Sequence, residues 1–141
     1  MRVQEMLMTK SPAIFSVGPD DSIEEALQAL AEKNVGVLLV VEDGKLLGIV
    51  SERDIVREAA ELGVALFAES VSAIMTTDLI IASPDDELGY LITTMTNQRI
   101  RHLPVMDDEE LIGIISIGDV VKSMQAKYEG ELHHLRHYVA E

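Results

Sequence analysis

The sequence predicts an α/β protein made of two copies of a strand-helix-strand-strand-helix unit. Three observations support this prediction. A corner motif of Gly, two β-branched residues, Ser, two variable residues and Asp occurs at residues 48–54 and again, 65 residues later, at 113–119. An amphipathic helix pattern and a pair of apolar strand patterns recur at the same offset. Because neither copy could bury much core alone, we expect a pseudo-twofold tandem with the sheets facing each other and the helices outside.

Composition restricts the class of protein. The 141 residues are 48 % hydrophobic and carry a net charge of −14, which repels phosphate backbones and argues against a nucleic-acid partner. The sequence has no Cys, which excludes disulfides and thiolate nucleophiles and fits a reducing, cytoplasmic location. The longest aliphatic run, residues 35–41, is far shorter than the ~20 residues of a membrane span. We therefore predict a soluble protein without membrane insertion.

Each unit begins with a short extended segment and an amphipathic helix. The extended segments are residues 13–17 and 79–83, and a Met-Thr pair precedes each of them. In both helices the apolar residues follow the i, i+3, i+4, i+7 spacing of one buried face. They are Ile23, Ala26, Leu27 and Leu30 in the first copy, and Leu88, Leu91, Ile92 and Met95 in the second. Ser22 and Glu25 predict a capping box for the first helix, and Asp86 is expected to cap the second.

Two strands follow each helix. Residues 35–41 and 100–106 are apolar and β-branched, which predicts strands buried on both faces. Asp43-Gly44 predicts a tight hairpin to a strand at 46–50. The second hairpin, which leads to a strand at 111–115, lacks the Gly, so we expect a looser turn there. The resulting division of the chain is repeat 1 at 1–69, repeat 2 at 70–128 and a helical tail at 129–141.

The Ser-x-x-Asp corners, Ser51–Asp54 and Ser116–Asp119, have two compatible interpretations. A Ser at the N-cap followed three residues later by an acidic residue is nearly a capping box, which stabilises a helix by about 1 kcal/mol. The same corner, at a junction between a strand and a helix, is also a candidate binding corner, because a helix N-terminus presents N–H groups to an anion. Recurrence at a matched offset favours two equivalent binding corners.

These features together resemble the cystathionine β-synthase (CBS) domain, and two in tandem resemble a Bateman module. The resemblance rests on the duplicated unit, the Met-Thr pair ahead of it and the corner at its end, and it covers residues 1–128. Residues 51–54, 99–105 and 116–119 are similar to those of small stand-alone bacterial proteins with two CBS domains. The resemblance implies two β-α-β-β-α CBS repeats and a homodimer that forms through the helices.

The resemblance also implies a regulatory function in signal transduction. An adenine nucleotide, AMP first and then NAD or ATP, would bind in the cleft between the repeats and switch conformation or assembly; no metal is expected. By this resemblance Asp54 and Asp119 would each hold a ribose cis-diol. Ser51 and Ser116 would offer a hydroxyl group and the N-terminus of the following helix.

Basic residues near the corners are candidate phosphate ligands. Arg101 and His102 precede Leu103-Pro104-Val105, where the resemblance implies such ligands. On a strand the side chains of Arg101 and His102 would point to opposite faces, so only one would face the cleft, and surface solvation is the alternative for either. Arg53 lies beside the first corner and has two alternative roles. It either contacts phosphate or is exposed to solvent at the start of the helix.

The sequence shows no recognisable catalytic motif. It has no Cys, no Gly-x-Ser-x-Gly elbow, no P-loop and no His-Glu-x-x-His, so we predict that the protein is not an enzyme; a nucleotide hydrolase would lack a visible nucleophile. His133, His134 and His137 form a cluster in the tail, where packing on the body or on a partner subunit is favoured over metal binding. The alternative to a sensor is a constitutive interaction module that docks on a separate enzyme or transporter without nucleotide control.

Overall fold

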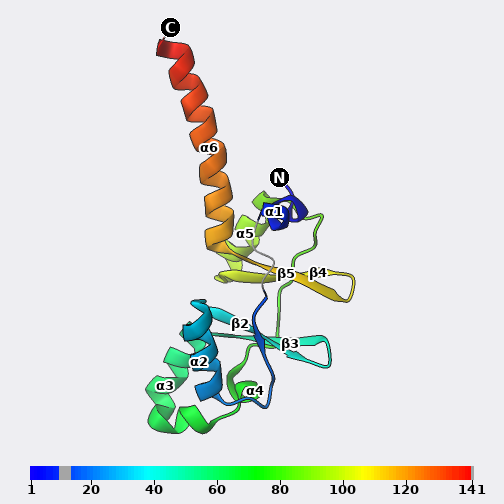
Figure 1. Ribbon diagram of the computed structural model, residues 1–141, viewed down its shortest axis with the longest axis vertical. Coiled ribbons are helices and arrows are strands. Elements are labelled where there is room, and N and C mark those ends of the chain that lie inside the picture. The colour runs from blue at the N-terminus through cyan, green and yellow to red at the C-terminus, as the bar shows by residue number, and fades with distance from the viewer. Residues whose placement is uncertain (10–13, 141) are drawn as a thin grey trace. The chain divides into compact units, whose positions relative to one another are not determined.

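The computed structural model describes residues 1–9 and 14–140, with side chains as far as Gly130. The chain forms two compact units whose composition does not follow the order of the sequence (Figure 1). Unit 2 is Ala13–Ile80, whereas unit 1 joins Met1–Pro12 to Ile81–Glu141. The beginning of the chain therefore completes the unit that is built from the second half of the sequence.

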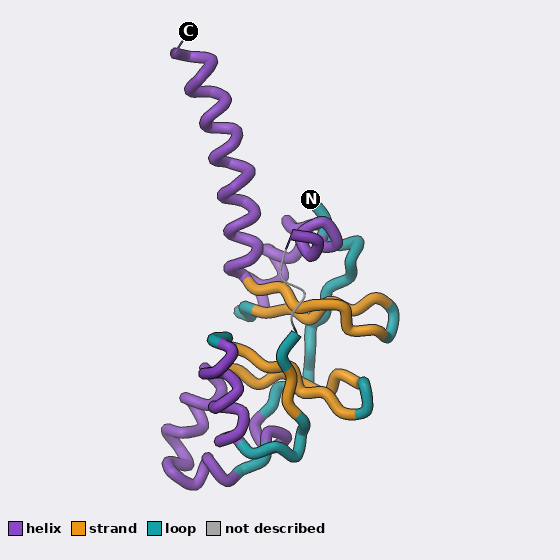
Figure 2. The backbone as a smooth tube through the Cα atoms, in the orientation of Figure 1, coloured by secondary structure: helices purple, strands orange, loops and turns teal. Residues whose placement is uncertain are grey.

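Unit 2 contains the predicted β-α-β-β-α order. Its elements are β1 (Ser16–Val17), α2 (Ile23–Lys33), β2 (Val37–Glu42), β3 (Lys45–Ser51), α3 (Glu52–Leu62), the 3₁₀ helix η1 (Gly63–Ala68) and α4 (Val71–Ile74). The strands form one sheet in the order β1-β2-β3, in which β1 is parallel to β2 and β3 is antiparallel (Figure 2). The strand predicted to be buried on both faces is confirmed, because residues 37–40 are all buried.

Unit 1 has the same arrangement, but the edge segment of its sheet is shorter than β1. Its elements are α1 (Val3–Thr9), α5 (Leu88–Gln98), β4 (His102–Asp107), β5 (Glu110–Ser116) and α6 (Ile117–Ala140). The extended segment predicted at residues 79–83 contributes one parallel bridge, from Ala82 to Val105, at the position equivalent to the pairing of Val17 with Val40. The edge strand of unit 2 is thus reduced to a single bridge in unit 1.

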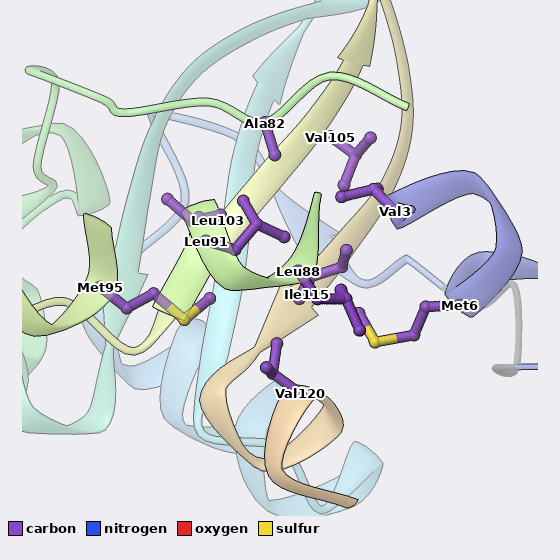
Figure 3. Close-up of a cluster of buried hydrophobic side chains, with 10 residues drawn as sticks. All are labelled: Val3, Met6, Ala82, Leu88, Leu91, Met95, Leu103, Val105, Ile115 and Val120. Carbon is purple, nitrogen blue, oxygen red and sulfur yellow. The ribbon is translucent and has the colours of Figure 1, made fainter. Parts of the chain in front are cut away.

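The predicted apolar helix faces are the buried ones. In α2 the buried residues are Ile23, Ala26 and Leu30, and in α5 they are Leu88, Leu91 and Met95. In unit 1 this face packs with residues of α1, β4, β5 and α6 in a single core (Figure 3). Each Ile, Leu or Met side chain of this set, when fully buried, contributes about 1.5–3 kcal/mol. Ser22 caps α2 as predicted, since its Oγ accepts from the Glu25 N–H at 3.1 Å.

The prediction that Asp86 caps the second helix is wrong. The N-cap of α5 is Glu87, which makes no side-chain capping bond. Asp86 Oδ2 instead accepts from the Ser83 N–H at 2.8 Å, as Asp21 Oδ2 accepts from the Gly18 N–H at 2.7 Å in unit 2. Asp86 is therefore the counterpart of Asp21, and each carboxylate closes the turn ahead of its helix. Glu87 stands at the position of Ser22, and Glu is a poorer N-cap residue than Ser.

The looser turn predicted for the second hairpin is also wrong. Both hairpins have two-residue loops, because Glu42 pairs with Lys45 and Asp107 pairs with Glu110. The first loop residue adopts a positive φ in each case, 52° at Asp43 and 55° at Asp108. Asp tolerates this left-handed conformation better than most residues do, so the second loop stays tight without Gly.

The segment that leads into each repeat packs on the other repeat's elements. In unit 2 the backbone N–H of Ile23 donates to Glu69 O at 2.9 Å, and that of Val71 donates to Asp21 O at 2.8 Å. The equivalent bonds in unit 1 run from Leu88 N to Met1 O (3.1 Å) and from Val3 N to Asp86 O (2.9 Å). The division at residues 69 and 70 remains a prediction about the sequence repeats, while these bonds define the packed units.

The Gly of each corner motif allows a lead-in segment to approach the sheet closely. A Cβ atom at Gly48 would lie 2.7 Å from Thr76 O and 3.0 Å from Met75 Sδ. At Gly113 it would lie 2.9 Å from Leu7 Cδ2. Neither glycine has a positive φ, so the motif requires Gly for space rather than for backbone conformation.

Candidate functional site

The first corner lies where β3 ends and α3 begins. Ser51 Oγ accepts from the Asp54 N–H at 3.1 Å, and Asp54 Oδ2 accepts from both the N–H and the hydroxyl of Ser51, at 3.2 and 2.9 Å. The Glu52 N–H donates to Gly36 O at 3.0 Å, which ties the start of α3 to the residue ahead of β2. These bonds make a complete capping box, so the capping role of this corner is established.

The second corner has the same construction. The Ser116 N–H donates to Asp119 Oδ2 at 2.9 Å, and the Asp119 N–H donates to Ser116 Oγ at 3.0 Å. The Ile117 N–H donates to Arg101 O at 2.8 Å, and His102 pairs with Ser116 across the β4–β5 hairpin. The structure therefore brings together the four predicted site residues of the second copy, which are Arg101, His102, Ser116 and Asp119.

Capping and ligand binding are compatible roles for the corner carboxylates. The capping bonds of both carboxylates go to Oδ2. An ionised carboxylate has about four acceptor positions, more than these capping bonds use. Asp54 and Asp119 are partly buried, whereas Arg53 and Arg101 are exposed. A partly buried anion beside an exposed cation at a helix N-terminus can bind a polyol on one side and an anionic group on the other.

The placement of Arg101 in a strand is wrong. β4 begins at His102, and Arg101 lies in the bend before it. Arg99 ends α5 with a φ of 56°, and the Ile100 N–H returns to Met95 O at 3.0 Å. Residues 99–101 therefore form the end of α5 and the bend that follows it. Because Arg101 lies outside the strand, the expectation that Arg101 and His102 point to opposite faces of a strand does not apply to it.

Each corner has one arginine, supplied by a different element. Arg101 stands at the position that Gly36 occupies in the first copy, and Arg53 stands at the position that Gly118 occupies in the second. The cation of the first corner thus comes from the first turn of a helix, and that of the second comes from the entry to a hairpin. The two corners resemble each other in charge but differ in where that charge is held.

Thr76 is a neighbour of the first corner that is not among the site residues predicted from the sequence. Its N–H donates to Ile49 O at 2.8 Å, and its O accepts from the Ile49 N–H at 3.0 Å, two residues before Ser51. Thr76 is exposed. The sequence feature that could have indicated Thr76 is the Met-Thr pair repeated ahead of each unit.

The side chains that the structure describes, up to Gly130, include no group of three or more His, Asp or Glu residues placed to hold a metal ion. The cluster of His133, His134 and His137 lies outside the described side chains, although its backbone belongs to α6. Within residues 1–9 and 14–140, none of the helices, α6 included, combines the length and apolar character needed to cross a membrane.

Comparison with known proteins decides the family. The sequence model of the CBS domain matches residues 3–61 and 71–126. The chain belongs to the CBS domain family. The two matches are a CBS pair, which confirms the predicted tandem and its mixed α/β fold class.

Two similar proteins show how much of the CBS pair is shared. A solved structure of a CBS-domain containing protein from Agrobacterium tumefaciens is 40 % identical, with a TM-score of 0.86, over 88 % of this chain and 99 % of its own. The mitochondrial CBS domain-containing protein CBSX3 of Arabidopsis thaliana is 37 % identical over 125 residues, which are 85 % of this chain. The chain spans 61 % of the length of that relative.

A third similar structure contains ligands. The CBS domain pair of protein MJ0100 was solved in complex with 5′-methylthioadenosine and S-adenosyl-L-methionine. It is 26 % identical to this chain, with a TM-score of 0.79, over 90 % of this chain and 98 % of its own.

Proposed function

We propose that this CBS pair is a regulatory module that senses an adenine nucleotide and is not an enzyme. The observation that carries the proposal is the repeated corner, in which a partly buried Asp, a capping Ser and an exposed Arg converge at the start of a helix. The complex of the related MJ0100 pair with two adenosine compounds supports an adenosine ligand.

The corner residues divide the nucleotide between them. Asp54 and Asp119 accept hydrogen bonds from the two ribose hydroxyls, which suits an ionised carboxylate. Ser51 and Ser116, with the helix N-termini that follow them, bind ribose or phosphate. Arg101, with His102 and Arg53 as further candidates, binds phosphate.

AMP is the first candidate ligand, ahead of NAD and ATP. Each corner supplies one Arg, while the whole chain carries a net charge of −14. A field of that sign disfavours ligands with more negative charge, and a triphosphate is penalised more than a monophosphate.

The signal is a shift between two conformations or assemblies. Nucleotide binding changes that equilibrium only if the two states bind the nucleotide with different affinity. We propose a cytoplasmic homodimer that forms through its helices and acts on a separate enzyme or transporter. The lack of Cys throughout the sequence suits a reducing compartment.

One observation favours a second candidate, a constitutive docking module. Both capping boxes are complete, so the Ser and Asp residues have a structural role of their own. In this alternative the corners only stabilise α3 and α6, and the protein docks on its partner without nucleotide control.

Titration calorimetry of AMP and adenosine against wild type and Arg101→Ala tests the proposal. Because a charge-assisted hydrogen bond contributes ~1.5–3 kcal/mol, Arg101→Ala should weaken AMP about ten- to a hundredfold and leave adenosine within about twofold. Lys45→Ala, which removes a cation from the opposite end of a strand–helix unit, is the control and should change neither affinity. Equal losses of AMP and adenosine would remove Arg101 from the phosphate role. No binding of either compound to wild type would favour the docking module.

A further inference from the structure

Glu52 is the residue that most clearly distinguishes the first corner from the second. In each unit the first residue of the corner helix donates its backbone N–H to the residue just ahead of the hairpin. Glu52 donates to Gly36 O at 3.0 Å, and Ile117 donates to Arg101 O at 2.8 Å. Both ends of these two bonds are related by the offset of 65 residues, so the bonds are equivalent. Glu52 therefore lies beside Gly36 as Ile117 lies beside Arg101.

The Glu52 carboxylate lies next to the point where a side chain at position 36 would begin. A Cβ atom at Gly36 would be 3.6 Å from Glu52 Oε2 and 3.9 Å from Glu52 Cδ. In the second corner the Arg101 side chain begins at the equivalent point, and Ile117 packs against the core of unit 1 instead of adding a charge. The first corner thus has a carboxylate where the second has the start of an arginine side chain.

The segments that lead into the two corners increase this difference in charge. The segment at 99–102 contains Arg99, Arg101 and His102, whereas the equivalent segment at 34–37 contains no basic residue. Together with its lead-in, the second corner therefore has two Arg residues against one Asp. The first corner has one Arg against two acidic residues, because Arg53 is flanked by Glu52 and Asp54.

We propose that Glu52 sets the ligand class of the first corner, which binds adenosine without phosphate, and that AMP binds only at the second corner. The inference rests on the proposed function and deepens it. Asp54 would bind the ribose hydroxyls as Asp119 does, but a phosphate group at the first corner would lie close to the Glu52 carboxylate, and like charges repel. Of the further phosphate candidates, the inference retains His102 and sets aside Arg53.

Titration calorimetry of the full chain with AMP and with adenosine counts the sites of each kind. Wild type should bind two equivalents of adenosine per chain and one of AMP. Asp54→Ala should remove one adenosine site and leave AMP binding unchanged. Asp119→Ala should weaken the other adenosine site and AMP with it.

Glu52→Gln removes the charge at nearly constant side-chain shape, so AMP should gain a second site while both adenosine affinities stay within about twofold. Combining it with Gly36→Arg should strengthen that second AMP site about tenfold, by a charge-assisted hydrogen bond. Gly36 has room for a Cβ atom and no positive φ, so it can accept this side chain.

The matched control is Glu61→Gln, which changes the net charge of the chain by the same amount. Glu61 is exposed on the same helix and lies roughly 13 Å from Glu52 along its axis. That separation exceeds the screening length of about 8 Å at physiological ionic strength, so Glu61→Gln should keep a single AMP site.

The outcomes separate this inference from the proposed function. Failure of wild type to bind either compound would overturn both. Two AMP sites or a single adenosine site in wild type would overturn the inference alone, because the protein would still bind an adenine compound. A Glu52→Gln variant that keeps one AMP site, or a Glu61→Gln variant that gains a second, would also overturn it, as would loss of AMP binding in Asp54→Ala.

Discussion

Asp119→Ala is expected to weaken adenosine binding by about 1.5–3 kcal/mol, or roughly ten- to a hundredfold. Asp119 supplies the one carboxylate among residues 116–119, and we propose that it accepts from both ribose hydroxyls. Its capping bond to the Ser116 N–H, at 2.9 Å, fixes Oδ2 at the edge of the helix. Titration calorimetry with adenosine measures this loss without any contribution from phosphate.

The control for Asp119→Ala is Asp86→Ala in the same unit. Asp86 also accepts a backbone N–H three residues before it, from Ser83 at 2.8 Å, but it closes the turn ahead of α5 rather than a corner. Both variants lose a local hydrogen bond, so each should cost up to about 1 kcal/mol of folding free energy. Only Asp119→Ala should lose affinity. If adenosine bound Asp119→Ala as tightly as wild type, the ribose assignment would be wrong.

Gly48→Ala is expected to lower the free energy of unfolding by about 2–3 kcal/mol, the upper part of the range for overpacking. The new methyl group would lie 2.7 Å from Thr76 O. That carbonyl cannot retreat freely, because Thr76 and Ile49 exchange two backbone hydrogen bonds, at 3.0 and 2.8 Å. Urea unfolding followed by far-ultraviolet circular dichroism measures the loss.

Gly113→Ala is the matched variant at the equivalent position of unit 1. Its methyl group would meet Leu7 Cδ2 at 2.9 Å, the end of a flexible side chain on a partly buried residue. A change of Leu7 rotamer relieves this contact, so the cost should stay below about 1 kcal/mol. Equal losses at Gly48 and Gly113 would contradict the explanation that a hydrogen-bonded backbone, rather than crowding in general, requires Gly48.

Features that depend on local periodicity could be predicted from the sequence. The buried faces of α2 and α5 follow from the spacing of apolar residues, and the Ser22 cap follows from a side chain three residues from its donor. The corners were found because both copies keep Gly, Ser and Asp at fixed positions. In each case the interacting groups lie within one or two helical turns, so the pattern alone determines the contact.

Features that depend on long-range packing could not be predicted in the same way. The lead-in segments bond to residues far away in the sequence, as Val3 does to Asp86, and no periodicity encodes that pairing. A second long-range contact of this kind places Thr76 beside Ile49, and so close to the first corner. The apolar Ile100 predicts a strand that includes Arg101, but the left-handed Arg99 ends α5 and β4 begins only at His102.

The measurement that tests the central claim most directly is a thermal-melt panel on ligand-free protein. The panel contains AMP, ADP, ATP, NAD, S-adenosylmethionine and adenosine, with GMP as the control. A ligand at 100 times its dissociation constant adds about 2.7 kcal/mol to stability, which shifts the melting temperature measurably. If the protein senses an adenine nucleotide, the melting temperature should rise with AMP, rise by the same amount or less with NAD and ATP, and stay constant with GMP. A melting temperature that stays constant across the whole panel would contradict nucleotide sensing and leave the corners as helix caps in a docking module.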